Sequence, residues 1–170
     1  PKQIISNRQE YGYREPILSY GTATQTTGAY LLQGECLQQL GQSQPAQDSF
    51  DKGIAMAEKE QQFELQAHGL YLKIRSREMQ EHAPGASTMA LEQLDKLLTN
   101  PGLKESQLQV YSRLLHVNAS MEERQFDLAK RQLTEARQWA EQAKNPLARA
   151  WVSAVGGDLY QALGQPQLAL

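Results

Sequence analysis

The chain has 170 residues, with 17 basic and 19 acidic side chains, a net charge of −2 and 40% hydrophobic residues. This balance, with no long block of like charge, excludes a dominant electrostatic affinity for nucleic acid or for an anionic membrane. The only cysteine, Cys36, excludes an internal disulfide and a cysteine-rich zinc site. No apolar run is long enough to span a bilayer, so we expect a cytoplasmic protein without a membrane partner. Because the first residue is not Met, we also expect a fragment of a larger protein.

The N-terminal stretch, residues 1–27, shows no regular apolar spacing. A glycine and four threonines lie between Gly21 and Thr27, and this composition disfavours a long helix. We therefore expect an irregular segment or cap that precedes helical repeats in residues 28–170. Within it, the run from Asn7 to Leu18 resembles the segment that opens the helical-repeat region of the large phosphatidylinositol-3-kinase-related kinases.

The first repeat, about 28–60, is predicted to hold helices at about 28–40 and 45–60. Gly34 has no Cβ and would let the second helix approach the first closely, and Gly41 suits a left-handed helix end. Ala46 and Phe50 begin one apolar face of the second helix. Cys36 falls in the middle of the first helix, where we expect a half-buried packing thiol.

The second repeat, about 61–101, begins with an apolar face at helical spacing. Its members are Phe63, Ala67, Leu70 and Ile74. A longer loop over residues 81–87 follows, and Ser87 or Thr88 would cap a helix that Asn100-Pro101-Gly102 ends.

The third repeat, about 102–145, is predicted to hold helices at about 104–121 and 127–144. A fourth, about 146–170, is truncated. The apolar face of its first helix would lack its usual cover, and we expect self-association through this C-terminal end or further repeats in the native protein. That face consists of Trp151, Val155 and Leu159.

Two observations indicate a repeat. The thirteen residues from Gly34 to Ala46 recur from Gly157 to Ala169 with seven identities, which is more than chance placement would give. Small anchors also recur at intervals of 44, 39 and 40 residues, at Ala46, Ala90, Ala129 and Ala169. A period near forty is one helical hairpin that must stack on neighbours to bury its apolar face.

These residues resemble the tetratricopeptide repeat family. In the first copy the matching positions are Tyr30, Gly34, Leu37, Gly41, Ala46 and Phe50, and in the last copy they are Gly157, Tyr160, Gly164 and Ala169. The resemblance implies an all-α fold, a right-handed superhelical solenoid of antiparallel helix hairpins. A repeat longer than the commonest form is similar to those of maltose-type transcription activators and of the sensory parts of some diguanylate cyclases.

Residues with catalytic or metal-binding chemistry are few. His68, His82 and His116 are the only histidines, and no pair of them has the spacing of metal ligands on one helix. We therefore expect no enzyme activity, no metal and no cofactor. Lys73, Arg75 and Arg77 cluster on one predicted helix close to an acidic residue, which favours a mixed-charge exposed face over a nucleic-acid patch.

A binding surface follows from the resemblance alone, because in this repeat family the first helix of each hairpin lines the concave side. The residues placed there are Glu35, Gln38, Gln66, Lys73, Asn118, Asp158 and Gln161. Their amides and charges suit an extended peptide held by hydrogen bonds to its backbone. The alternative that they merely solvate an inner face stays open.

The leading functional hypothesis is a non-enzymatic scaffold or regulatory module that binds a protein or peptide partner. The alternative is a ligand-sensing segment of a bacterial signalling protein, of the transcription-activator or diguanylate-cyclase type. A third alternative is a helical-repeat segment of a large phosphatidylinositol-3-kinase-related kinase.

Overall fold

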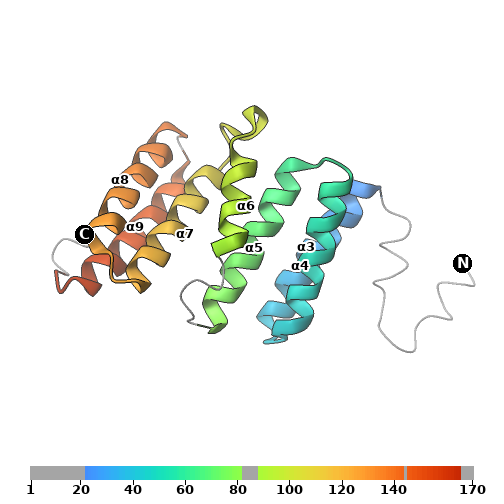
Figure 1. Ribbon diagram of the computed structural model, residues 1–170, viewed down its shortest axis with the longest axis horizontal. Helices are drawn as coiled ribbons and strands as arrows, with labels where there is room; N and C mark the ends of the chain where they lie inside the picture. Colours follow the sequence, from blue (N-terminus) through green and yellow to red (C-terminus); the bar gives the residue numbers. More distant parts are fainter. Residues whose placement is uncertain (1–21, 82–87, 144, 166–170) are drawn as a thin grey trace, which may run out of the picture. The chain divides into compact units, whose positions relative to one another are not determined.

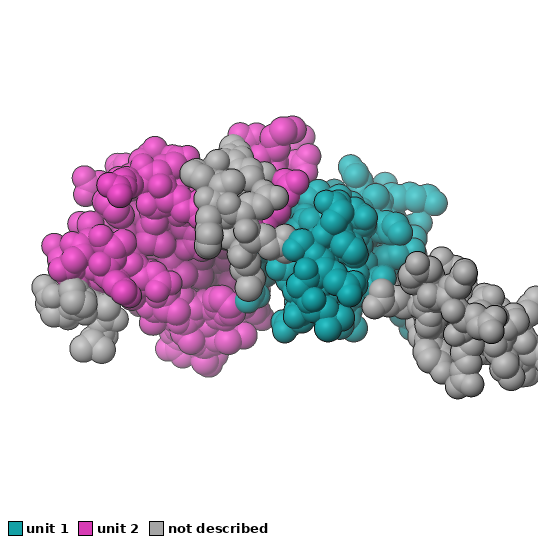
Figure 2. All heavy atoms as spheres, turned by 90° about the horizontal axis from the view of Figure 1, so that it is seen from below, with its two compact units in different colours: residues 1–76 teal, residues 77–170 magenta. Residues whose placement is uncertain are grey.

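The computed structural model describes residues 22–81, 88–143 and 145–165. Over these ranges the chain forms seven α-helices and one short 3₁₀ helix, and no strand (Figure 1). The prediction of an all-helical fold is therefore confirmed. No helix of the described ranges is both long and apolar enough to cross a membrane. The described residues fall into two compact units that divide after Ser76 (Figure 2).

The first unit contains α3 (Ala23–Gln39), α4 (Ser43–Lys59) and the beginning of α5 (Phe63–Glu81). Helix α3 begins five residues before the predicted boundary at residue 28. Thr22 is its N-cap: the Thr22 hydroxyl accepts a hydrogen bond from the Gln25 amide, and the Gln25 side chain accepts one from the Thr22 amide. A threonine at this position satisfies helix amides that have no other partner, so the threonine-rich run starts a helix. The rest of the predicted N-terminal segment, residues 1–21, lies outside the described residues.

Glycines allow α3 and α4 to pack closely. Gly41 has a φ of +71° in the turn that joins them, as the sequence predicts. A Cβ on Gly34 would lie only 2.4 Å from Cε1 of Phe50, and one on Gly53 would lie 2.7 Å from Cδ2 of Leu31. Both contacts are too short for a real side chain, so the predicted close approach at Gly34 is confirmed.

The second unit contains α6 (Thr88–Leu98), the 3₁₀ helix η1 (Pro101–Leu103), α7 (Leu108–Glu122), α8 (Phe126–Gln142) and α9 (Pro146–Ala162). Asn100 ends α6 as predicted, and its side chain accepts a hydrogen bond from the Gly102 amide. Because η1 intervenes, α7 begins at Leu108 and the predicted start near residue 104 is wrong. Of the two residues predicted to cap α6, Thr88 is the first residue of the helix, whereas Ser87 lies outside the described residues with the rest of 82–87.

The core of the second unit lies among α7, α8 and α9, which run side by side in Figure 1. Ala129 and Ala136 of α8 are completely buried, which lets the neighbouring helices approach. From α9, Val155 and Leu159 pack into the same core, and Trp151 lies partly buried against it. The expectation that this face of α9 lacks cover is therefore wrong, because α7 and α8 cover it.

Candidate functional site

A groove of about 480 Å³ opens on the second unit. It is lined by α6, by the residues around η1, and by α7 and α8. The lining residues are Asp95, Leu98, Thr99, Lys104, Gln109, Ser112, Arg113, His116, Glu135 and Trp139. Most of these residues carry a polar group, and the Trp139 and His116 side chains contribute aromatic rings.

Helix α7 contributes the largest share of the lining because of its residue spacing. Gln109, Ser112, Arg113 and His116 recur three or four residues apart and therefore lie on one face of the helix. From α8, Glu135 and Trp139 are four residues apart and share a face in the same way.

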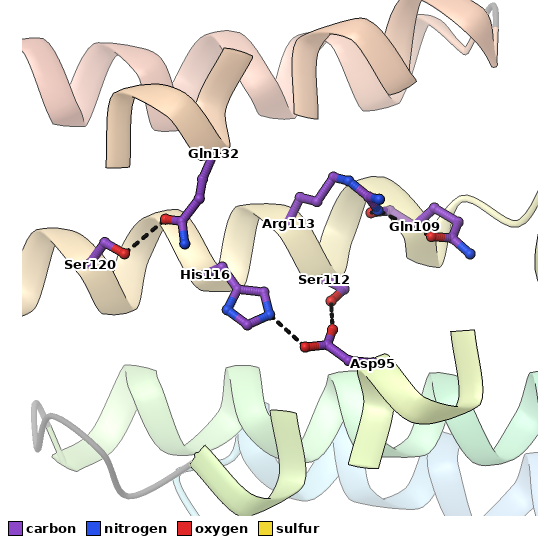
Figure 3. A network of polar contacts seen from close by, with 7 residues as sticks. All are labelled: Asp95, Gln109, Ser112, Arg113, His116, Ser120 and Gln132. Carbon is purple, nitrogen blue, oxygen red and sulfur yellow. Dashed lines mark hydrogen bonds and ion pairs between the residues drawn. The ribbon is translucent and has the colours of Figure 1, made fainter. Parts of the chain in front are cut away.

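Asp95 of α6 is the centre of a polar cluster with two α7 side chains (Figure 3). The Ser112 hydroxyl donates to Oδ1 at 2.6 Å, and Nε2 of His116 lies 2.7 Å from Oδ2. Burial by itself raises the pKa of Asp95, but hydrogen bonds from His116 and Ser112, with the charges of His116 and Arg113, outweigh it. The pKa of Asp95 is therefore lowered, and both carboxylate oxygens are engaged.

This cluster does not have the arrangement of a catalytic relay. In such a relay a hydroxyl donates to an imidazole, which a carboxylate then orients. Here Ser112 and His116 both bond to Asp95, so the serine hydroxyl is directed to the carboxylate. In the structure, Asp95 orients the Ser112 hydroxyl and the His116 imidazole.

Arg113 presents a half-buried guanidinium beside the cluster. Its Nη1 donates to the Gln109 carbonyl at 2.7 Å and to Gln109 Oε1 at 3.1 Å, and its guanidinium carbon lies 4.5 Å from the centre of the Trp139 ring. Burial lowers the pKa of Arg113, and the charges of Glu135 and Asp95 oppose this shift. An arginine nevertheless remains protonated in a protein, so the groove carries a fixed positive charge.

Gln109 holds this guanidinium in position. The Gln109 side chain is buried, and its Nε2 donates to the Leu98 carbonyl at 2.8 Å and the Leu103 carbonyl at 3.2 Å. The end of α6 and the end of η1 are thereby fixed to α7. The side of Arg113 that faces Gln109 is consequently ordered before any ligand arrives.

A second polar contact on α7 lies outside the groove. The Ser120 hydroxyl donates to Oε1 of Gln132 on α8 at 2.8 Å (Figure 3). This bond joins the two helices of the hairpin and has no part in the groove lining.

The seven residues predicted to line a concave face lie on α3, α5, α7 and α9. Glu35, Gln38, Gln66, Lys73 and Asn118 are partly buried, whereas Asp158 and Gln161 are exposed. None of the seven lines the groove described above. Their role as partner contacts stays a prediction.

Two of these residues are engaged inside the first unit. Gln38 accepts a hydrogen bond from the buried Ser76 hydroxyl, which in turn accepts one from Gln47 at 2.9 Å. Lys73 forms an ion pair with Asp51 of α4. These bonds connect helices of the hairpin core, so both side chains already have structural partners.

The other residues that could carry out catalysis or bind a metal do not lie together in one site. His68 stacks on Tyr71, His116 bonds to Asp95, and His82 lies outside the described residues. The prediction of a half-buried thiol is wrong, because Cys36 is exposed while its neighbours Gly34 and Leu37 are buried. Within the described ranges, no group of three or more histidine, cysteine or acidic residues could hold a metal ion.

Sequence reasoning identified His116 but not the residues with which it forms a site. The sequence signal for this site is a polar face of α7, from Gln109 to His116, whose residues alternate along the helix with the buried Val110, Leu114 and Val117. A polar stripe beside an apolar one is also typical of a solvated helix face. Without knowing that Asp95 lies opposite, the sequence favours that ordinary interpretation.

No protein-family model matches the chain, and no similar curated protein or solved structure was found. The resemblance to tetratricopeptide repeats therefore depends on the residues quoted for it.

Proposed function

We propose that this chain is a non-enzymatic binding module that holds a segment of a partner protein in the groove of its second unit. The proposal extends to the architecture, in which tetratricopeptide-like hairpins stack into a right-handed solenoid. The observation that carries it is the groove of about 480 Å³ with its ordered polar lining. Mixed apolar and polar lining is typical of sites that take a ligand.

The groove offers the groups that an extended peptide needs. Trp139 and Leu98 supply apolar surface, while Thr99, Lys104 and His116 supply donors and acceptors for side chains or backbone. The polar groups of α7 are held by Gln109 and Asp95, so a peptide would meet side chains that have already lost rotamer freedom. A smaller ordering cost leaves more of the contact energy as affinity.

The experiment is selection from a random peptide display library on the immobilised protein, followed by affinity measurement with a groove-filling variant. Thr99→Trp places a bulky ring in the groove, and Thr134→Trp is its control. Both threonines are exposed and donate their hydroxyl to a backbone carbonyl of their own helix region, but only Thr99 lines the groove.

We expect Thr99→Trp to weaken binding of the selected peptides by about tenfold or more, and Thr134→Trp to leave it unchanged. Equal binding by both variants, or failure to select any peptide, would contradict the proposal.

The second candidate function is a ligand-sensing segment of a signalling protein. The groove volume of about 480 Å³ favours it, because small-molecule pockets span roughly 300–1,000 Å³. A thermal-shift screen with a metabolite library tests it. Stabilisation by a small molecule that Thr99→Trp abolishes, with no peptide selected, would favour sensing over peptide binding.

A further inference from the structure

We propose that the groove recognises an acidic side chain of its peptide ligand, with the Arg113 guanidinium and the Lys104 ammonium as the groups that bind the carboxylate. This inference depends on the proposed peptide-binding function. The ligand is therefore an Asp- or Glu-containing segment of a partner protein.

The first step is the state of Arg113. Among the described residues, its Nη1 alone forms hydrogen bonds, both to Gln109, and no carboxylate lies within ion-pair distance of its guanidinium. Its Nε is buried and has no partner among the described residues. A half-buried guanidinium normally satisfies its donors with a carboxylate or a phosphate, often in a bidentate pair. The buried Nε is closed to a ligand, so Nη2 is the donor of Arg113 that remains for an anion.

The second step concerns the nearest negative charge. Asp95 lines the same groove, and an unpaired carboxylate there would repel an acidic ligand. Both of its oxygens, however, are engaged by Ser112 and His116, and neither forms an ion pair with Arg113. Asp95 therefore orders the groove wall and leaves Arg113 available.

The third step compares the two remaining charges of the lining. Lys104 lies just after η1 and Glu135 lies on α8, and both are exposed. Lys104 adds positive charge to the rim, whereas Glu135 interacts with Arg113 at a range longer than an ion pair. A ligand carboxylate at Arg113 would be attracted by Lys104 and repelled by Glu135. The two side chains therefore predict opposite effects of charge removal.

The experiment measures the affinity of a peptide that the native protein selects from the display library, with the ends of the peptide blocked. Lys104→Gln is paired with Lys96→Gln, since both lysines are exposed and only Lys104 lines the groove. Glu135→Gln is paired with Glu141→Gln, since both lie exposed on α8 and only Glu135 lines the groove.

We expect the selected peptides to be enriched in Asp and Glu. Lys104→Gln should weaken binding a few-fold, because exposed ion pairs contribute little. Arg113→Gln should weaken it about tenfold or more, because a charge-assisted bond in a half-buried site contributes more. Glu135→Gln should strengthen binding, a gain that misfolding could not produce. The two control variants should bind like the parent.

The two hypotheses fail in different ways. Failure to select any peptide overturns both the binding function and this inference. Selection of peptides without acidic enrichment, or an affinity that Arg113→Gln and Glu135→Gln leave unchanged, overturns the inference and leaves peptide binding intact.

Discussion

In the hairpin of α3 and α4, glycines lie beneath large side chains, whereas in the hairpin of α7 and α8 alanines form the contact face. Gly34 lies against the Phe50 ring, while Ala129 and Ala136 are buried beside aliphatic residues. Both hairpins bring two helices close together. In the first hairpin a glycine faces an aromatic ring, and in the second the contact is made by completely buried alanines.

The polar groups of the two units differ as well. In the first unit, Ser76 and Gln47 are buried and bond to each other between helices. In the second unit, the side chain of Asp95 is 43% exposed and its cluster opens on the groove. Polar groups that are enclosed between helices fix how those helices pack, whereas polar groups that solvent reaches are also accessible to a ligand. This comparison is the reason why we propose that a partner binds to the second unit.

The largest expected effect is that of Phe50→Ala. It should lower the free energy of unfolding by about 3–5 kcal/mol, because Gly34 has no side chain that could fill the resulting cavity. Leu133→Ala, four residues after Ala129 as Phe50 is four after Ala46, should cost less, about 2–3 kcal/mol. Urea denaturation followed by circular dichroism measures both. Equal losses of unfolding free energy would show that the contact between Gly34 and the Phe50 ring contributes no more to stability than an ordinary core contact.

The next largest effects are expected for glycine-to-alanine substitutions, which should change the stability of the two units by different amounts. Gly34→Ala should destabilise the protein by about 1–3 kcal/mol, because the new Cβ would lie 2.4 Å from the Phe50 ring. Gly28→Ala on the same helix meets nothing within 4 Å and should stabilise by up to about 1 kcal/mol. In the second unit, Gly156→Ala meets only Leu133 at 3.4 Å and should be nearly neutral.

The melting temperatures of these three variants give the order of their stabilities directly. A Gly34→Ala variant that melts at or above the parent temperature would contradict the close packing of α3 and α4.

Removing one hydroxyl from each polar cluster should have a smaller effect. Ser76→Ala leaves the buried Gln47 amide without its acceptor and should cost about 1–3 kcal/mol. Ser112→Ala should cost less, about 0.5–1 kcal/mol, because water can reach Asp95 through the groove. Chemical denaturation of the two variants under identical conditions makes the comparison. The reverse order would mean that the Asp95 cluster is the structural one.

The smallest effect is a pH dependence from Asp95. Its pKa in the folded protein is lowered, so its contribution to stability is present above the ordinary aspartate value of about 3.9. That contribution is lost as the pH falls through the lowered pKa. Because the side chain is 43% exposed, solvent screening keeps the effect small. As the pH falls below the ordinary aspartate value, the stability difference between the parent and Asp95→Asn should shrink, and a difference that grows in that range would contradict the assignment.

Local patterns predicted most of the fold because they act over one or two helix turns. Ala67, Leu70 and Ile74 share a buried face of α5 as predicted, whereas Phe63 at its start is exposed. Asn100 with Pro101 ends α6. Where a local sequence signal fits two structures, the observed helix boundary differs from the predicted one. Thr22 caps α3 instead of belonging to a linker, because the same residue type serves both purposes.

The candidate site was not predictable in the same way. Asp95 and His116 are brought together by the packing of α6 on α7, and the spacing of residues in the sequence does not predict that contact. The Arg113–Trp139 stack likewise joins two helices. Cys36 was expected to be half-buried from its place within a helix, but it is exposed, because Gly34 and Leu37 occupy the buried face of that helix.

The most direct test of the assignment of binding to the second unit is amide chemical-shift mapping by NMR during titration with a selected acidic peptide. The account predicts the largest changes around Asp95, Lys104, Arg113 and His116. Changes confined to Glu35, Gln38 and Lys73 of the first unit, with the groove residues unaffected, would contradict it.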